Sequence, residues 1–158
     1  MAAPDVNPGK AFYCTTPIYY VNDAPHIGHA YTTTAGDVLT RWHRQCGDPV
    51  WFLTGVDEHA TKVFRVAQEQ GLTAQAYVDS IAGSWRDLAP RLNAHPDFFI
   101  RTSDDGHKAF VREFLQRMYD NGDIYEDVYE GLFCVGCEEC KAAADLVDGR
   151  CPDHEIVP

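Results

Sequence analysis

The chain has 158 residues, of which 45% are hydrophobic, so it has material for about one domain and is not a disordered protein. Its 13 basic and 24 acidic side chains give a formal net charge of −11, which excludes a uniformly basic surface for nucleic acid. Residues 120–158 alone hold 2 basic and 11 acidic side chains. The acidic charge is therefore concentrated in a short carboxyl-terminal segment.

The first predicted element is a strand over residues 11–16, a β-prone run without charge that is typical of the interior of a parallel sheet. A helix is predicted to begin near Pro25, because Asn22 or Asp23 can cap a helix and proline suits its first turn. Gly47 is a natural stop for this helix. Its apolar residues fall roughly on one face and are Ile27, Tyr31, Val38, Leu39, Trp42 and Cys46.

Residues 50–54 repeat the buried-strand pattern and end at Gly55, which completes a predicted βαβ unit. The loops after its two parallel strands are expected at one edge of the sheet, where α/β proteins bind ligands. The remaining predicted elements are helices over residues 58–70, 74–92 and 105–121, a strand over residues 98–100, and a β-rich connector from residue 124. The last helix is expected to bury Phe110, Phe114, Leu115 and Met118.

The most informative motif is Pro25-His26-Ile27-Gly28-His29. At a helix start, His26 and His29 project on one side, where free backbone N–H groups and the helix dipole favour phosphate. Gly28 would let a flat ring such as adenine approach the backbone. An isolated H-x-x-H is more often a pair of exposed polar residues, but this pair follows a predicted strand and opens a predicted helix. The context favours a nucleotide site, and neither GxGxxG nor GxxxxGK occurs in the chain.

The longer string TTPIYYVNDAPHIGHAY resembles the HIGH signature of the class I aminoacyl-tRNA synthetases, specifically of the methionyl-tRNA synthetases. The resemblance continues through DVLTRWHRQCGDPVWFLTGVDEHATKV, PDFFIRTSDDGHK and GDIYEDVYEGLFCVGCEECK, so it covers nearly all of residues 11–158. It implies an α/β fold in which residues 11–119 form the amino-terminal half of a Rossmann-like catalytic domain with a parallel sheet. Residues 120–158 would then begin the connective peptide, with its zinc knuckle.

The resemblance implies a methionine–tRNA ligase, which adenylates methionine with ATP, accompanied by Mg²⁺, and transfers it to tRNA. His26 and His29 would contact the ATP phosphates, with Gly28 beside the adenosine. Ile18 and Tyr20 match positions that line the methionine side-chain pocket, and Asp57 would hold the methionine ammonium group. A carboxylate at the end of a strand suits that role physically, although capping of the following helix is an equally common use of such an aspartate.

Two residues depart from the family's T-D-E-H-G motif, which here reads Val56-Asp57-Glu58-His59-Ala60. The first departure replaces a hydroxyl with an isopropyl group, and the second replaces a glycine with a methyl-bearing residue. The second change is harmless where the native φ is negative and costly where it is positive.

Cys134-Val-Gly-Cys137 and Cys151-Pro-Asp-His154 are two ligand pairs separated by residues 138–150. This spacing is typical of a zinc knuckle, and a Cys3His set would close the coordination sphere around a structural zinc ion. The resemblance places the zinc ligands at the same four residues. Cys140 remains a free thiol or an alternate ligand, and chance clustering or redox pairing is the alternative for the whole group.

The family's lysine-containing KMSKS motif, the second half of its nucleotide fold and its anticodon-binding domain do not occur in these residues. We therefore expect the chain alone to have little or no aminoacylation activity, with most tRNA contacts made by the missing carboxyl-terminal parts. The alternatives are a truncated zinc-bearing paralogue with a binding or regulatory role, and a small nucleotidyltransferase. No apolar run could span a bilayer and the polar start has no signal region, so a cytoplasmic protein without a membrane partner is expected.

Overall fold

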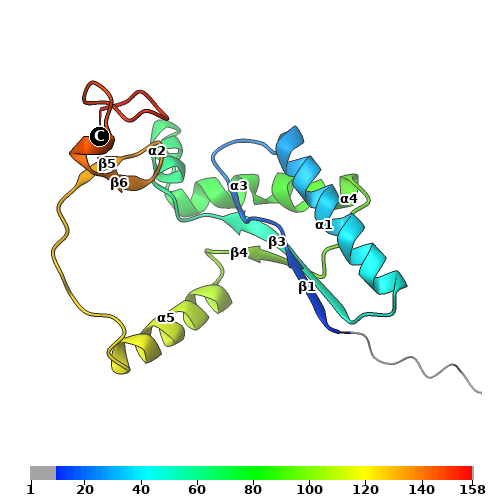
Figure 1. Cartoon of the computed structure of the whole chain (residues 1–158). Coiled ribbons are helices and arrows are strands. Elements are labelled where there is room, and N and C mark those ends of the chain that lie inside the picture. Colours follow the sequence, from blue (N-terminus) through cyan, green and yellow to red (C-terminus); the bar gives the residue numbers. More distant parts are fainter. Residues whose placement is uncertain (1–9, 158) are drawn as a thin grey trace, which may run out of the picture. The chain divides into compact units, whose positions relative to one another are not determined.

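A computed structural model describes residues 10–157 of the chain (Figure 1). The chain folds as two compact units, Met1–Lys108 and Ala109–Pro158, which are described separately below. Residues 1–9, on which the expected absence of a signal region rests, lie outside the described residues. None of the helices within residues 10–157 has the length and apolar character needed to cross a bilayer.

A four-stranded parallel sheet forms the centre of the first unit, and β3 is its middle strand. The strands are β1 (Phe12–Thr15), β2 (Tyr19–Tyr20), β3 (Val50–Asp57) and β4 (Phe98–Arg101). Leu53 pairs with both β1 and β4, and Val56 pairs with both β2 and β4. Strands β1 and β2 therefore share one edge of β3, and β4 occupies the other. The predicted parallel βαβ unit is confirmed.

Helix α1 (Ile27–Gln45) follows β2 and leads to β3. It starts two residues after Pro25, because its N-cap is His26 and not Asn22 or Asp23. A Cβ atom on Gly36 would lie 2.9 Å from the Phe52 ring, so the helix approaches the sheet closely there. The buried residues of α1 are Thr33, Gly36, Asp37 and Thr40. Its predicted apolar face exists but faces away from the sheet, and Ile27, Tyr31, Val38, Leu39 and Trp42 are all exposed.

Three helices lie between β3 and β4: α2 (Thr61–Glu69), α3 (Ala74–Arg86) and α4 (Leu88–Arg91). The predicted continuous helix over residues 74–92 is wrong, because it is interrupted at Asp87. Pro90 has no N–H to continue the hydrogen-bond ladder but fits the first turn of a new helix. The core of this unit consists of Tyr19, Val21, Val56, Val63, Ala67, Tyr77, Val78 and Trp85.

The two departures from the family motif fit this backbone. Val56 is fully buried in the core, so its isopropyl group is in apolar surroundings. Ala60 has a φ of −131°, which any L-residue adopts without strain. Neither substitution disturbs the loop between β3 and α2.

The second unit contains most of helix α5 (Asp105–Asp120), followed by β5 (Leu132–Cys134), β6 (Glu139–Lys141) and a short 3-10 helix (Ala143–Asp145). Strands β5 and β6 form an antiparallel pair. Residues 124–131 carry no regular structure, so the predicted β-rich connector begins later than residue 124. The expectation that α5 buries its apolar residues is also wrong. No residue of this helix is buried, and Phe110, Phe114 and Leu115 are exposed.

The contact between β3 and β4 depends on Gly55, since a Cβ atom there would overlap the backbone carbonyl oxygen of Ile100. We expect Gly55→Ala to lower the free energy of unfolding by about 1–3 kcal/mol, the usual range for overpacking. Gly83 in α3 has open space around its Cβ position, so Gly83→Ala should raise the free energy of unfolding by about 0.5–1 kcal/mol. Urea denaturation followed by tryptophan fluorescence measures both values. Equal effects of the two variants would contradict this role of Gly55.

Candidate functional site

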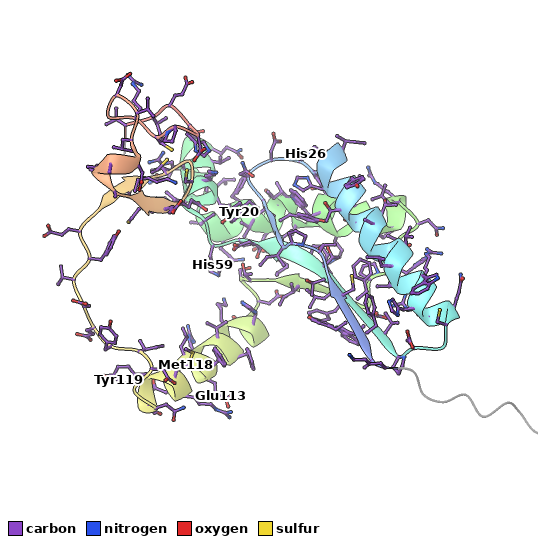
Figure 2. The ribbon with its side chains drawn as sticks, in the orientation of Figure 1. Tyr20, His26, His59, Glu113, Met118 and Tyr119 are labelled. Atoms are coloured by element: carbon purple, nitrogen blue, oxygen red, sulfur yellow. The ribbon has the colours of Figure 1, made fainter. Side chains whose placement is uncertain are left out.

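The start of α1 is capped by two histidines that exchange hydrogen bonds with its backbone. The Gly28 N–H donates to Nδ1 of His26 over 3.1 Å, and the His26 N–H donates to Nδ1 of His29 over 3.0 Å. This arrangement is a capping box, in which the first and fourth positions are usually Ser or Thr and Glu or Gln. Figure 2 shows His26 at this end of α1. The histidines therefore satisfy backbone donors at the helix start as well as carrying imidazole groups.

These two bonds determine which imidazole nitrogen carries the proton. A backbone N–H can only donate, so each Nδ1 must present a lone pair, and each neutral ring must carry its proton on Nε2. The His29 ring lies 4.7 Å from the rings of both Tyr19 and Trp85. Burial lowers the pKa of His29, and the nearby His26 lowers it further. The helix start thus presents Nε2 of both rings as hydrogen-bond donors.

A pocket of about 420 Å³ opens beside this helix start. It is lined by Ile18, Tyr19, Tyr20, Asn22, Asp23, Ala24, His26, His29 and Trp85. The structure therefore brings the predicted apolar residues Ile18 and Tyr20 to the same pocket as both histidines. Gly28 does not line it, and a Cβ atom on Gly28 would lie 3.0 Å from the His26 ring, so this glycine makes room for the capping imidazole.

Two further aromatic residues of this pocket were not identified as site residues from the sequence. Tyr19 is buried, stacks on Trp85 at 5.6 Å, and its hydroxyl lies 3.2 Å from that of Thr33. Trp85 lies on α3, within the predicted helix over residues 74–92, and it is 3% exposed. Within the described part of the chain, its indole N–H has no hydrogen-bond acceptor. Helical periodicity can indicate that a residue such as Trp85 is buried, but it cannot show that the residue borders a pocket.

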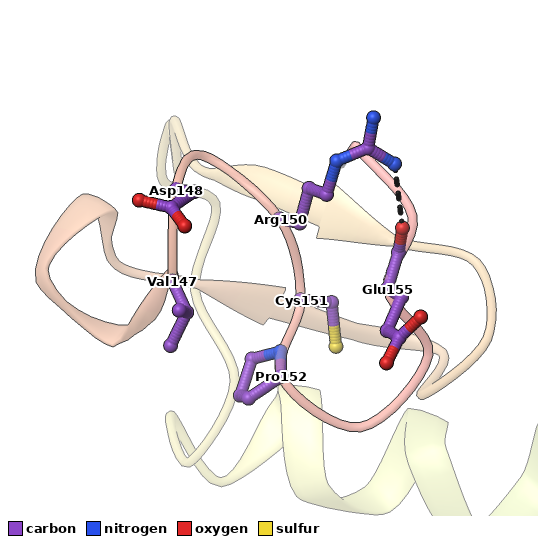
Figure 3. Close-up of a pocket in the computed structure, with 6 residues that line it drawn as sticks. All are labelled: Val147, Asp148, Arg150, Cys151, Pro152 and Glu155. Atoms are coloured by element: carbon purple, nitrogen blue, oxygen red, sulfur yellow. Dashed lines mark hydrogen bonds between the residues drawn. The ribbon is translucent and has the colours of Figure 1, made fainter.

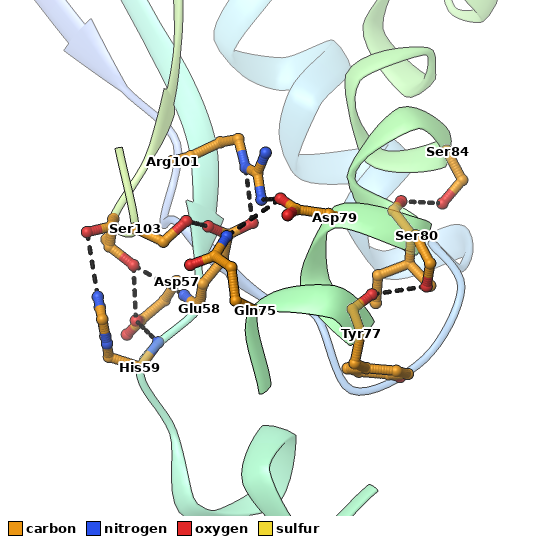
Figure 4. Close-up of polar contacts among 12 residues, drawn as sticks. Asp57, Glu58, His59, Gln75, Tyr77, Asp79, Ser80, Ser84, Arg101 and Ser103 are labelled. Carbon is orange, nitrogen blue, oxygen red and sulfur yellow. Dashed lines mark hydrogen bonds and ion pairs between the residues drawn. The ribbon is translucent and has the colours of Figure 1, made fainter. Parts of the chain in front are cut away.

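Asp57 is the last residue of β3 and is paired in register with Tyr20 of β2, which places it next to the pocket. Its Oδ1 accepts the His59 N–H over 3.1 Å (Figure 4). The N-cap of α2 is Ala60, which makes no side-chain cap. Asp57 therefore does not serve as the cap of the following helix, and its carboxylate is held at the carboxyl end of the strand.

In the second unit, the four predicted ligands come together. One donor atom from each of Cys134, Cys137, Cys151 and His154 lies within 4.8 Å of the others. A Cβ atom on Gly136 would overlap the His154 ring, so a glycine is required where the turn passes the imidazole. Cys140 lies on β6 opposite Phe133 and is not part of this group. Three thiols and an imidazole at this spacing are a donor set that can hold a metal ion.

The thiols of this cluster influence each other's ionisation. A hydrogen bond from the Cys137 backbone lowers the pKa of Cys134, whereas burial and the neighbouring thiols raise the pKa of Cys137 to about 12. Thiolates bind metal only after losing their protons. A divalent cation held by the four donors would stabilise the thiolate forms of these cysteines.

The loop that carries Cys151 is held by its own backbone and by Arg150 (Figure 3). The Cys151 N–H donates to the carbonyl of Ile156, and an Arg150 guanidinium N–H donates to the carbonyl of Glu155, each over 2.9 Å. Residues Val147, Asp148, Arg150, Cys151, Pro152 and Glu155 surround an open pocket of about 420 Å³ on this loop. Cys151 itself is fully buried, so the loop presents its thiol to the cluster and not to solvent.

Comparisons of the sequence and of the structure with known proteins agree on one family. The model of the family described as tRNA synthetases class I (M) matches residues 12–156. The chain is 54% identical over 155 residues to a methionine–tRNA ligase of Streptomyces coelicolor, covering 92% of this chain and 29% of that protein. It is 52% identical over 144 residues to the methionine–tRNA ligase of Thermosynechococcus vestitus, covering 90% of this chain and 27% of the relative.

A solved structure, Mycobacterium tuberculosis methionyl-tRNA synthetase in complex with methionyl-adenylate, superposes with a TM-score of 0.83 at 39% identity. The match covers 90% of this chain and 28% of that protein. The chain thus spans less than a third of the length of these relatives.

The capping geometry predicts the tautomers of individual histidines. In their neutral forms, His26 and His29 should carry the ring proton on Nε2, whereas His43, whose Nδ1 lies 2.6 Å from an Asp48 carboxylate oxygen, should carry it on Nδ1. Long-range ¹H–¹⁵N correlation spectra of the imidazole rings distinguish the two forms, with His43 as the internal contrast. A proton on Nδ1 of both His26 and His29 would rule out the two hydrogen bonds of the capping box.

Proposed function

The chain belongs to the class I tRNA synthetase (M) family, and we propose that it is the part of a methionine–tRNA ligase that binds ATP and methionine for adenylation. The observation that carries this proposal is the single pocket in which His26 and His29 meet Ile18 and Tyr20, with Asp57 paired beside Tyr20. We assign residues 11–119 to the amino-terminal half of the catalytic domain and residues 120–158 to the start of the connective peptide.

The proposed role of the histidines follows from their geometry. In adenylation, a methionine carboxylate oxygen bonds to the α-phosphorus of ATP while the bond from that phosphorus to pyrophosphate breaks. The Nε2–H groups of His26 and His29 donate to phosphate oxygens as negative charge develops on them, and the start of α1 adds its positive dipole end. Mg²⁺, if it accompanies ATP, would supply further charge neutralisation. Gly28 contributes by leaving space for the His26 ring.

The methionine would be held beside this phosphate site. The Asp57 carboxylate pairs with its ammonium group, since a charge-assisted hydrogen bond is the strongest contact available to that group. Ile18 and Tyr20 line the adjacent pocket and suit the thioether side chain. The two histidines, Ile18 and Tyr20 thus line one pocket, and Asp57 is paired beside Tyr20.

The cysteine cluster is proposed to hold a structural zinc ion through Cys134, Cys137, Cys151 and His154. The donor set and the glycine beside His154 fit such an ion. Four protein ligands leave no position for a substrate, so the ion would stabilise the second unit and take no part in adenylation.

The exposed apolar surfaces of the first unit support the proposal that it belongs to a longer ligase. Tyr13 and Trp51 are paired in register and both are exposed on the sheet, and the apolar stripe of α1 is exposed as well. Patches of this kind mark interfaces. We infer that the remaining polypeptide of the ligase, which in the relatives is more than two thirds of the chain, covers them and supplies the KMSKS loop and most tRNA contacts.

The proposed function is tested by methionine-dependent ATP–pyrophosphate exchange. The chain alone is expected to show little or no exchange, because the lysine loop that clamps the triphosphate is not among its residues. A chimera in which residues 12–156 replace the matching part of the Streptomyces coelicolor ligase should be active. His26→Ala in that chimera should lower the exchange rate by about 100-fold, as expected for the loss of one donor to developing charge.

The control for this experiment is Asp105→Asn, which alters a fully exposed carboxylate and should leave the rate unchanged. Turnover by residues 1–158 alone at the rate of the chimera would contradict the assignment of the chain as a partial catalytic unit. A folded but inactive chimera would contradict the adenylation role itself, and zinc binding without any effect of His26→Ala would favour the paralogue with a binding role.

Metal content tests the zinc proposal separately. Protein purified under reducing conditions should contain about one zinc per chain, and Cys137→Ser should reduce this ratio to near zero because the tetrahedral set is then incomplete. Cys140→Ser is the matched control and should retain the metal. Elemental analysis after dialysis measures the ratio, and zinc-free protein with an intact second unit would be evidence against the assignment.

A further inference from the structure

Asp57 ends β3, and the loop that follows it lies against Thr102, the residue directly after β4. The Thr102 N–H donates to the carbonyl of Val56 over 3.3 Å, and the Thr102 carbonyl lies 3.2 Å from Nε2 of His59. The Thr102 hydroxyl oxygen accepts the Glu58 N–H over 2.8 Å. Thr102 therefore contacts the loop on both sides of Asp57.

The hydroxyl of Thr102 has one hydrogen to donate, and the structure directs it to Asp57. Because the oxygen already accepts the Glu58 N–H, its own hydrogen points elsewhere, and the Asp57 Oδ1 lies 3.4 Å away. The same Oδ1 accepts the His59 N–H. Two donors on one oxygen fix the rotation of the carboxylate about its side-chain bonds. Thr102 is 7% exposed, so little water competes for these contacts.

A buried ion pair anchors the end of β4 in this position. The Glu58 side chain is 1% exposed, its Oε1 accepts Nε–H of Arg101 over 2.8 Å, and its Oε2 accepts the hydroxyl of Ser103. A second Arg101 N–H donates to Asp79 of α3 over 2.6 Å. A carboxylate this deeply buried is tolerated only with such partners, and loss of one partner is costly. The residues on either side of Thr102 are thus tied to the loop that Thr102 contacts.

From this geometry we propose that Thr102 is a positioning residue for Asp57: its hydroxyl holds the carboxylate in one rotamer, facing the substrate ammonium group. The inference rests on the proposed function, in which Asp57 binds that ammonium. Thr102 lies outside the T-D-E-H-G motif, 45 residues after Asp57 in the chain. It acts through Asp57 and through the loop backbone, without contact to substrate.

The decisive measurement is the χ1 rotamer of Asp57 in the 158-residue chain, read from three-bond couplings between its side-chain carboxyl carbon and the backbone. The parent chain and Thr102→Ser, which keeps the hydroxyl, should show one rotamer. Thr102→Val, which has the same shape without the hydroxyl, should show averaged couplings. Thr40→Val is the matched control. It removes a fully buried hydroxyl that donates to the Asp37 carbonyl of α1, and should leave Asp57 unchanged.

Methionine affinity gives a second readout. Binding of L-methionine, followed in the same spectra, should weaken about tenfold in Thr102→Val and be restored in Thr102→Ser, as expected for a lost hydrogen bond to a charged group. N-acetylmethionine, which has no ammonium group, should show no such difference. A general loss of packing would lower the affinity for both ligands and would shift the resonances of the core residue Val63.

The outcomes separate this inference from the proposed function. An unchanged Asp57 rotamer in Thr102→Val, or a rotamer that Thr102→Ser fails to restore, overturns the positioning role. If the parent chain binds no methionine, the ammonium role proposed for Asp57 fails in this chain, while the rotamer comparison still decides the role of Thr102.

Discussion

The parallel pairing of β3 on both of its edges is the constraint on which the rest of the first unit depends. Parallel neighbours bring the carboxyl ends of the strands to one edge of the sheet, so the residues that follow β2, β3 and β4 meet there. Gly55 allows β4 to approach β3 closely enough for this pairing. The pocket beside Tyr20, the carboxylate of Asp57 and the hydroxyl of Thr102 are all consequences of that one arrangement.

The start of α1 shows how a structural need and a chemical need are met by the same side chains. Four backbone N–H groups at a helix start require acceptors, and Ser, Thr, Asp or Glu usually supply them. Here Nδ1 of His26 and Nδ1 of His29 supply two, which leaves each ring with its Nε2–H as a donor. A carboxylate in either place would satisfy the backbone equally well but would repel a phosphate. The proposed phosphate contacts would therefore explain the choice of histidine, which helix stability alone does not.

Much of this fold could be predicted because its signals are local. The strand patterns at residues 11–16, 50–54 and 98–100 and the metal-ligand spacing depend on neighbouring residues, and the structure has strands and a ligand cluster at these places. The start of α1 was predicted to within two residues, but its cap was not, since histidine is an uncommon cap and Asn22 and Asp23 carry the stronger local signal. The contact of Thr102 with Asp57 joins residues that are adjacent only through the pairing of β3 with β4. Periodicity identified the apolar faces of α1 and α5 but not what would cover them.

The burial of α1 is the inverse of the usual amphipathic pattern, because its apolar residues lie on the outer face. Its inner face is polar and is stabilised by hydrogen bonds: Thr33 with the Tyr19 hydroxyl, and Asp37 with the His95 N–H and with Arg41. Hydrogen bonds of this kind fix orientation but contribute modest net free energy. The apolar stripe on the outer face, from Ile27 to Trp42, carries most of the hydrophobic area that α1 could bury. The sheet therefore determines where His26 and His29 point, while covering the stripe would determine how firmly they are held there.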